Sequence, residues 1–318
     1  MLKSDKKIVV IGGGTGVFTT LSGLKHYFKN LTAVVTMADD GGSTGFLREE
    51  FGILPPGDIR RALIALAASD NKILAQLFSY RFQEGAGLSG HSFGNLMIAA
   101  LERITGSFDK AVEEVGKILA IQGKVLPVTL KHTSLMAELE NKVVIKGETN
   151  IDIPKHDGNL KIKKVWLKPE APLNPLAQKV ILEADAIVIG PGDLYTSIVP
   201  NLLASGMKQA LKKAKGKKIY FVNLMTKFGE TTGFRAPDFI NTIEQYLGKG
   251  VLDYVVINKT RPSLMRFRPY VKERAEFVEP DLDNLPKKPI PVITNLLRRS
   301  GLIRHDSDKL AKVVGMLI

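Results

Sequence analysis

The sequence predicts an α/β protein in which a mainly parallel sheet carries helices on both faces. Apolar segments of strand length alternate with segments of helix length through most of the 318 residues, which is the pattern of a parallel sheet. Five of the predicted strands run directly into loops rich in glycine and polar residues. Over 124–168 the pattern changes to short successive strands, which predicts a small β-rich insertion within a single domain spanning 1–318.

The composition is that of a globular protein. Hydrophobic residues make up 44% of the chain and charged residues 24%, which is ordinary for a soluble fold. No apolar run approaches the roughly 20 residues that a membrane-spanning helix needs, and the charged segment 1–7 is not interpreted as a signal peptide. The chain contains no cysteine, so disulfides and thiolate metal sites are excluded, which fits a cytoplasmic protein.

The net charge of +13 favours anionic partners. The basic residues are spread along the chain and are not interleaved with aromatic residues. The densest basic run, 212–218, falls where a helix is predicted to end, a position that suits lysine because of the helix dipole. The distribution therefore argues against nucleic-acid binding.

The first predicted strand, 8–11, runs straight into the glycine-rich segment 12–16, and a helix is predicted over about 17–28. A strand, a turn without side chains and a helix N-terminus together form an anion site, because backbone N–H groups face the ligand. The segment has neither the complete dinucleotide fingerprint nor the lysine of a P-loop. A tight turn that needs only positive φ is the alternative. The residues predicted to contact a phosphate or diphosphate are Gly13, Gly14, Thr15 and Gly16.

Two acidic residues, Asp39 and Asp40, follow the second predicted strand, 33–37, and precede a predicted helix over 44–51. A dinucleotide-binding fold places an acid here on a ribose hydroxyl. Adjacent carboxylates can also hold Mg²⁺ beside a phosphate. Because aspartate is equally common in turns and at helix N-caps, a purely structural role stays open.

A helical region is predicted over about 59–120, with Asp58 as its N-cap. Asp58 is also a candidate ligand contact. Arg60 and Arg61 follow in the first turn, where cations oppose the helix dipole. Their position predicts a negative group nearby, supplied by an aspartate or by a ligand phosphate.

His91 and Asn95 flank the start of a further helix near Ser92, after a glycine-rich break. They are predicted substrate contacts, although a single histidine more often caps or packs. The other histidines lack metal-ligand spacing, which argues against a zinc site. No Ser-His-Asp order or nucleophile elbow is evident, so no catalytic residue is assigned.

Four short strands are predicted in the insertion, at 125–130, 135–139, 143–146 and 160–167. The spacing of these segments favours tight connections, including a turn at Glu140 and Asn141. Pro175 after Asn174 then predicts a capped helix start beyond the insertion.

Three more parallel strands are predicted at 186–189, 219–222 and 254–257, each followed by a polar loop. Since the carboxyl ends of parallel strands share one edge, these loops should converge with the first two on a ligand. The loop after 186–189 supplies the candidates Gly190, Gly192, Asp193, Tyr195, Thr196 and Ser197. Asn223 follows the next strand, and 225–234 is interpreted as a lid.

Seven motifs, in order, resemble one family over almost the whole chain. They are GGGTG, MADDGGSTGFLREEFG, LPPGDIR, GHSFGN, GPGDLYTSIVPN, NLMT and IRHD. The family is that of the gluconeogenesis factors, the YvcK-type branch of the CofD-like 2-phospho-lactate transferase superfamily. The resemblance implies a Rossmann-like three-layer α/β fold with a small β-rich insertion, in a cytoplasmic bacterial protein.

The resemblance also implies binding of a nucleotide sugar, UDP-N-acetylglucosamine, without an established reaction. It implies a role in cell shape and wall synthesis during growth on gluconeogenic carbon sources, and hence protein partners of cell-wall or cell-shape type. Asn201 and Arg304 match positions that contact the nucleotide sugar in this branch.

Two further functions stay open. The transferase relatives use Mg²⁺, and Asp39 and Asp58 match positions where carboxylates lie near the metal and the acceptor, so a Mg²⁺-dependent transferase is the first alternative. An NAD-dependent oxidoreductase is the second, with NAD as a ligand of the same pocket. The sequence leaves the oligomeric state open, a homo-oligomer included.

Overall fold

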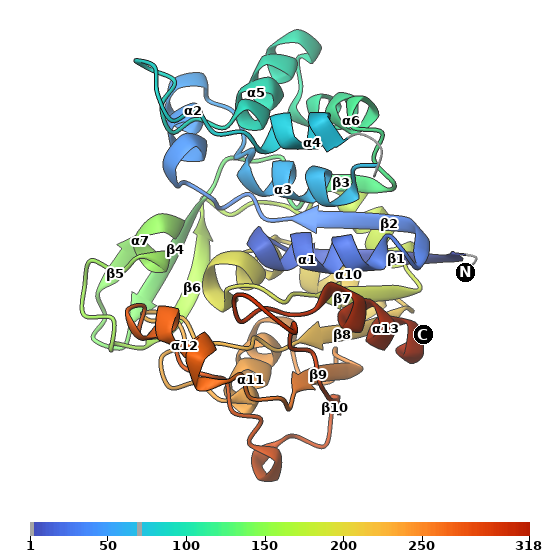
Figure 1. Ribbon diagram of the computed structural model, residues 1–318, viewed down its shortest axis with the longest axis vertical. Coiled ribbons are helices and arrows are strands. Elements are labelled where there is room, and N and C mark those ends of the chain that lie inside the picture. The colour runs from blue at the N-terminus through green and yellow to red at the C-terminus, as the bar shows by residue number, and fades with distance from the viewer. Residues whose placement is uncertain (1–2, 69–71) are drawn as a thin grey trace.

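A computed structural model of the chain describes residues 3–68 and 72–318, and Figure 1 shows its two sheets. The larger sheet has seven strands in the order β10-β9-β8-β7-β1-β2-β3, and every neighbouring pair is parallel. Its strands are β1 (Ser4–Gly12), β2 (Phe28–Val35), β3 (Lys124–Pro127), β7 (Ala186–Ile189), β8 (Lys217–Phe221), β9 (Tyr254–Asn258) and β10 (Ile290–Thr294). The predicted α/β fold is confirmed.

The strand order reverses between β1 and β7. From β1 the sheet grows outward through β2 to β3, and the chain then returns to pair β7 with the other side of β1 before continuing to β10. The loops after β1 and β7 therefore flank the switch point of the sheet, which is where open parallel sheets bind their ligands.

Helices cover both faces of the larger sheet (Figure 1). They are α1 (Gly14–Leu24), α2 (Gly42–Phe51), α3 (Gly57–Leu66), α4 (Lys72–Ser79), α5 (Phe93–Thr105), α6 (Phe108–Ile118), α7 (Glu148–Asp152), α8 (Pro175–Glu183), α9 (Val199–Leu202), α10 (Met207–Lys213), α11 (Ala236–Leu247), α12 (Leu264–Val271) and α13 (Ser307–Leu317). Helix α1 packs against α3 and α13, while α10 packs against α8 and α11. Within the described ranges, no helix has the length and apolar character needed to cross a membrane.

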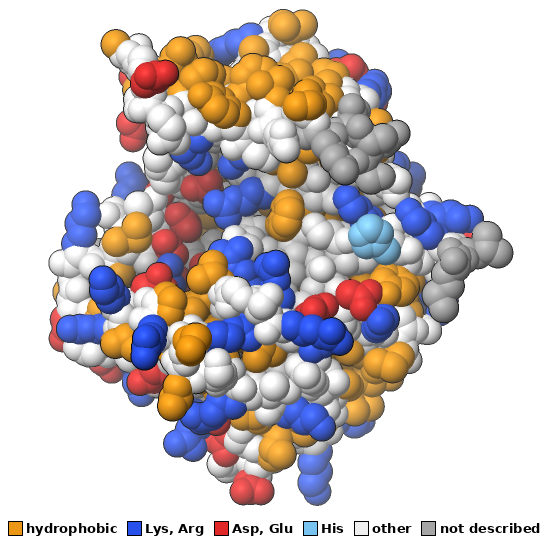
Figure 2. Space-filling model, viewed as in Figure 1, with side chains coloured by type: hydrophobic (Ala, Val, Ile, Leu, Met, Phe, Trp, Pro, Cys, Tyr) orange, Lys and Arg blue, Asp and Glu red, His pale blue; other side chains and the backbone are white. Residues whose placement is uncertain are grey.

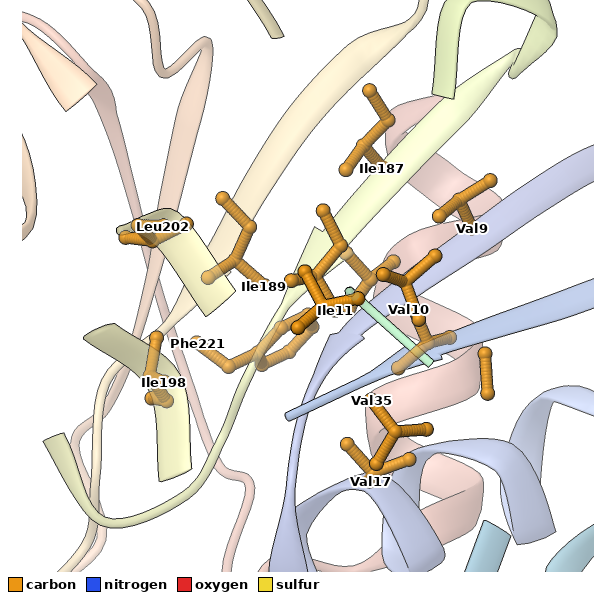
Figure 3. Close-up of a cluster of buried hydrophobic side chains, with 14 of the residues drawn as sticks. Val9, Val10, Ile11, Val17, Val35, Ile187, Ile189, Ile198, Leu202 and Phe221 are labelled. Atoms are coloured by element: carbon orange, nitrogen blue, oxygen red, sulfur yellow. The ribbon is translucent and has the colours of Figure 1, made fainter. Parts of the chain in front are cut away.

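The hydrophobic core lies between the sheet and these helices. Strand β7 is buried along its whole length, and the second half of β1 is buried as well. Figure 3 shows Val10, Ile11, Ile189 and Phe221 of neighbouring strands in one cluster. Because helices cover both faces, these strands are continuous apolar runs rather than alternating ones, and this rigid centre holds the loops at the strand ends.

The smaller sheet belongs to the insertion. Its strands are antiparallel, in the order β5-β4-β6, with bounds β4 (Ser134–Leu139), β5 (Val144–Lys146) and β6 (Ile162–Lys168). The prediction began the insertion at residue 124, but β3 pairs in parallel with β2 as the edge strand of the larger sheet. A short apolar segment does not encode its partner strand, which is why the sequence pattern missed this assignment.

Three other predictions need correction or restriction. The helix predicted over 17–28 ends at Leu24, and Phe28 already starts β2. Strand β10 was not predicted, because it contains Pro291 and its side chains are only partly buried, as an edge strand allows. The helical region 59–120 contains α3 to α6, and residues 69–71 within it lie outside the described residues.

Candidate functional site

A cavity of about 480 Å³, the main cavity, lies at the carboxyl edge of the larger sheet. Its walls come from the loops after β1, β2 and β7, from α3, and from α7 of the insertion. Figure 2 shows a hollow on this face with acidic and basic side chains around it. The lining residues are Gly13, Gly14, Thr15, Gly16, Thr36, Asp39, Gly41, Gly42, Ser43, Thr44, Gly57, Asp58, Arg60, Arg61, Arg81, Asn95, Glu148, Thr149, Asp152, Ile153, Gly192, Asp193, Thr196 and Ser197.

The glycine loop after β1 forms one wall. All four predicted phosphate contacts in it line the main cavity. A Cβ on Gly16 would lie 1.7 Å from the carbonyl oxygen of Pro191, and one on Gly13 would lie 2.5 Å from Asp58 Oδ2. Helix α1 starts at Gly14, and Gly13 at its N-cap position has no side chain to cap it. The N–H of Gly14 interacts with the Asp58 carboxylate, and the other N–H groups in the first turn of α1 face a ligand at this wall.

The loop after β7 packs directly against the glycine loop, and buried polar groups hold it. Residues 194–198 form a π-helical turn. Glu230 accepts hydrogen bonds from the Tyr195 N–H and the Thr196 hydroxyl, both at 3.0 Å. Asn201 donates from Nδ2 to the carbonyl of Ser197 at 2.9 Å. Ser197 and Thr196 line the main cavity, whereas Tyr195 and Asn201 are buried behind the loop, away from this cavity and from the second cavity that adjoins it.

Gly190 also lies behind this loop. Its carbonyl accepts a hydrogen bond from the Thr20 hydroxyl at 3.3 Å, and its φ of +71° is one that glycine adopts readily. Gly192 and Asp193, the next candidates along the chain, do line the cavity.

Five carboxyl groups line the main cavity: Asp39 after β2, Asp58 on α3, Glu148 and Asp152 on α7, and Asp193 after β7. Burial, with repulsion from Asp39, raises the pKa of Asp58 to about 6. Burial also raises the pKa of Asp39. The same causes raise the pKa of Glu148 to about 9, with Asp39 and Asp152 as the strongest repelling neighbours. The structure therefore concentrates acidic groups beside the glycine loop, and the raised pKa of Glu148 keeps that side chain protonated at neutral pH.

Asp58 is not the predicted N-cap. The N-cap position of α3 is occupied by Pro56, and Asp58 lies in the first turn of the helix. Its carboxylate points at the glycine loop, as the close approach to Gly13 shows. Asp58 thus satisfies the prediction that Arg60 and Arg61 have an acid nearby, since its charge acts on Arg60.

Asp40 differs from Asp39 in its surroundings. Its carboxylate accepts hydrogen bonds from the N–H groups of Glu148 at 3.1 Å and Thr149 at 2.8 Å. Asp40 does not line the main cavity. The structure gives it a role in attaching α7 to the loop after β2, in place of the predicted ligand contact.

Three arginines, Arg60, Arg61 and Arg81, form the basic side of the main cavity. Arg60 is buried, whereas Arg61 and Arg81 are exposed. Within residues 3–68 and 72–318, none of the three lies within 4.0 Å of a carboxylate. Their positive charge is available to an anion.

His91 and Asn95 meet Ser43 where α2 and α5 begin. Ser43 Oγ lies 3.2 Å from His91 Nδ1 and accepts a hydrogen bond from Asn95 Nδ2 at 3.3 Å. Asn95 lines the main cavity, but His91 does not and packs edge-on against Phe46. His91 therefore supports this corner from behind.

A second cavity of about 290 Å³ adjoins the main one. The two share the residues Thr15, Gly16, Gly192 and Asp193. Arg304, Asn223 and His305 line the second cavity; Arg304 is exposed and His305 is buried. The glycine loop and the loop after β7 thus separate two adjacent spaces, one lined by Arg60, Arg61 and Arg81 and the other by Arg304 and Glu273.

Four charged residues connect the insertion to these loops. Carboxylate oxygens of Asp152, Asp193 and Glu230 lie within 4.8 Å of one another, an arrangement that a metal ion can bridge. Lys227 Nζ lies 2.9 Å from Asp152 Oδ1 and supplies one positive charge to the group. Burial raises the pKa of Glu230 to about 8, and repulsion from Asp193 adds to the effect.

The loop 225–234, predicted as a lid, is anchored. Glu230 and Thr231 are buried, and Thr226 exchanges hydrogen bonds with Glu276. The loop 258–263 after β9, expected at the ligand edge, lines neither cavity; Asn258 bonds to the backbone of Thr260 and Leu296 instead.

The sequence did not single out several cavity residues: Arg81, Thr44, Glu148, Thr149 and Asp152. Four of them lie outside the loops that follow strands of the larger sheet. The rule that ligands bind at the carboxyl ends of parallel strands therefore did not predict them. The one available signal for α7 was its acidic content inside a segment that reads as strands and turns.

Comparison with known proteins gives concordant results. A family model described as 2-phospho-L-lactate transferase CofD matches residues 8–297. The chain is 43% identical over 312 residues to the gluconeogenesis factor of Bacillus subtilis, covering 97% of this chain and 96% of that one. It is 41% identical over 313 residues to the gluconeogenesis factor of Halalkalibacterium halodurans, covering 97% and 95%. A crystal structure of a UPF0052 family member from Bacillus halodurans matches with a TM-score of 0.93 at 39% identity, covering 98% of this chain and 99% of that chain.

Proposed function

Because the chain belongs to the CofD family, in the branch of the gluconeogenesis factors, we propose that it binds a nucleotide sugar without turning it over. The ligand we propose is UDP-N-acetylglucosamine. Through this ligand the protein acts as a cytoplasmic regulator of cell shape and wall synthesis during gluconeogenic growth. Its partners in that role are proteins of the wall or cell-shape machinery.

The observation that carries this proposal is the pair of cavities that meet at the switch point of the sheet. A nucleotide sugar has a diphosphate in its middle and a polar group at each end. The glycine loop shared by both cavities suits the diphosphate, since its N–H groups lie at the start of α1. Hydroxyl groups of the ligand then reach Asp39 on one side, and Arg304 lies on the other.

Calorimetric titration tests the proposal. UDP-N-acetylglucosamine, NAD and GDP are each titrated into the protein with and without Mg²⁺. Tight binding of the UDP-sugar that does not depend on metal supports a sensor. Failure of the UDP-sugar to bind under both conditions overturns the proposal.

A variant locates the ligand. Arg304→Ala should weaken binding of UDP-N-acetylglucosamine more than tenfold, about 1.4 kcal/mol, because a guanidinium pairs with phosphate oxygens through two hydrogen bonds. Arg299→Ala is the matched control: it removes the same charge five positions away, at an exposed residue that lines neither cavity. Equal affinities for the two variants would contradict the placement of Arg304.

A second function has its own support in the acids of the main cavity. Asp39 and Asp58 offer carboxylate oxygens beside a phosphate-binding loop, which is the ligand type that Mg²⁺ prefers. When bound, the metal would neutralise charge on a transferring phosphoryl group. The protein's own residues would hold the phosphate on the glycine loop and orient it with Arg61. A Mg²⁺-dependent transferase is therefore the alternative.

Product formation distinguishes the two functions. If the chain is a transferase, Asp58→Asn should abolish transfer from a nucleotide carrier to an acceptor. Binding of GDP that requires Mg²⁺ would favour this alternative. Retention of full transfer by Asp58→Asn would exclude Asp58 as a metal ligand in that reaction.

A further inference from the structure

Among the residues that the structure describes, Arg60 is a buried cation without an ion-pair partner. It is 8% exposed. Nη1 donates a hydrogen bond to the carbonyl of Phe78 at 3.4 Å, while Nε has no partner within the described residues. Burial and repulsion from Arg61 and Arg81 lower its pKa to about 10, an effect that the charges of Asp58 and Asp39 offset only in part, so it stays charged at neutral pH. A buried and unpaired charge is costly, and this cost points to an anion that completes the site.

Arg60 and Arg61 serve different ends of the main cavity. Arg61 lies at the glycine loop: a Cβ on Gly14 would be 3.7 Å from its Nη1. Arg60 runs along the start of α5, where a Cβ on Gly94 would be 2.7 Å from its Cδ. Consecutive residues of a helix point about 100° apart, and this divergence separates the two guanidinium groups.

The end of the cavity near Arg60 contains a further polar group in need of a partner. Asn95 is 2% exposed and lines the cavity, and in the described part of the chain its Oδ1 meets no hydrogen-bond donor. Because an amide oxygen only accepts, its partner must be an O–H of the ligand, from a hydroxyl or a protonated phosphate oxygen. Ser43, in the first turn of α2, accepts a hydrogen bond from Nδ2 of the same side chain. The N-termini of α2 and α5 thus meet beside Arg60, and each adds positive potential.

We propose that the end of the main cavity lined by Arg60, Arg81 and Asn95 is a second phosphate subsite, separate from the glycine loop. Its ligand is a small phosphorylated metabolite that binds beside the nucleotide sugar. Two guanidinium groups and two helix N-termini match the double charge and the several oxygens of a phosphoryl group. The subsite goes beyond the proposed function, because a nucleotide sugar has no phosphate group besides the diphosphate that the glycine loop takes.

The test is calorimetric titration with inorganic phosphate, performed with UDP-N-acetylglucosamine absent and at saturating concentration. Arg81→Ala changes an exposed residue, and Arg60→Lys keeps the charge but loses the planar pair of donors. Each should weaken phosphate binding at least fivefold, while Arg299→Ala stays within twofold of the unmodified protein. Circular dichroism and the midpoint of thermal unfolding confirm that each variant is folded.

Two results would overturn the subsite: unmodified protein that does not bind phosphate at millimolar concentration, or phosphate affinities of Arg81→Ala and Arg60→Lys equal to that of Arg299→Ala. If Arg60→Lys does not fold, the phosphate affinity of Arg81→Ala alone decides whether the subsite exists. Displacement of all phosphate by the UDP-sugar would also contradict a separate subsite. If the UDP-sugar fails to bind while phosphate binding still depends on Arg81, the proposed function falls and the subsite stands.

Discussion

The two walls of the main cavity are built in different ways. The wall at the switch point is made of backbone, with glycines after β1 and a buried π-helical turn after β7. The wall from the insertion is made of side chains, with Glu148 and Asp152 on α7. The first wall depends on close contact between main chains, whereas the second depends on charge and on two hydrogen bonds. They should therefore fail differently when mutated.

The largest effect is expected at the backbone wall. Gly16→Ala places a Cβ 1.7 Å from the Pro191 carbonyl oxygen, so the loops after β1 and β7 must separate. We expect a loss of about 3 kcal/mol or more in the free energy of unfolding, together with loss of ligand binding. Urea unfolding measures it. Gly315→Ala is the control, because a Cβ there meets no described atom within 4 Å; similar losses for both variants would refute the contact argument.

An intermediate effect is expected at the attachment of the insertion wall. Asp40→Ala removes the acceptor for the Glu148 and Thr149 N–H groups. We expect this change to lower the free energy of unfolding by about 2 kcal/mol. Limited proteolysis should then cut the insertion faster than the rest of the chain. Asp283→Ala, at an exposed residue, should change stability by less than about 0.5 kcal/mol. A protease pattern equal to that of the unmodified protein would show that α7 is held elsewhere.

The last predicted effect depends on pH and belongs to Glu148. Its pKa is about 9 in the folded protein and about 4.3 when unfolded. Between these values the folded state keeps a proton that the unfolded state has lost, so stability falls as pH rises. Glu148→Gln has no carboxyl group to titrate, so its stability should not fall in this way. Its free energy of unfolding should rise relative to that of the unmodified protein by at most about 1.4 kcal/mol per pH unit.

Urea unfolding at pH 6 and pH 8 checks the prediction for Glu148. The difference in free energy of unfolding between Glu148→Gln and the unmodified protein should be larger at pH 8 than at pH 6. Glu170→Gln, at an exposed residue, should show no comparable trend. An advantage that is the same at both pH values would mean that charge at residue 148 does not limit stability.

The same contrast explains how far the sequence predicted the site. The glycine loop, Asp39 and the loop after β7 follow strands, so the rule for parallel sheets located them before the structure did. Asp58 was located differently, as a predicted helix cap and through a family motif. Asp40 has the same residue type and the same loop as Asp39, but its role depends on a helix more than 100 residues away. Arg81 and Glu148 reach the cavity only through tertiary packing. Local pattern could not place them, nor assign the strand at 124–127 to the larger sheet.

The adjacent residues Asp39 and Asp40 couple the position of the insertion to the occupancy of the main cavity. Asp39 faces the main cavity, and one peptide bond further on Asp40 holds α7. A ligand that shifts the Asp39 carboxylate therefore also shifts Asp40, which holds α7. Binding of the cavity ligand then changes the affinity of the insertion for a partner. By thermodynamic reciprocity, a partner that binds the insertion changes the affinity of the cavity for its ligand by the same factor.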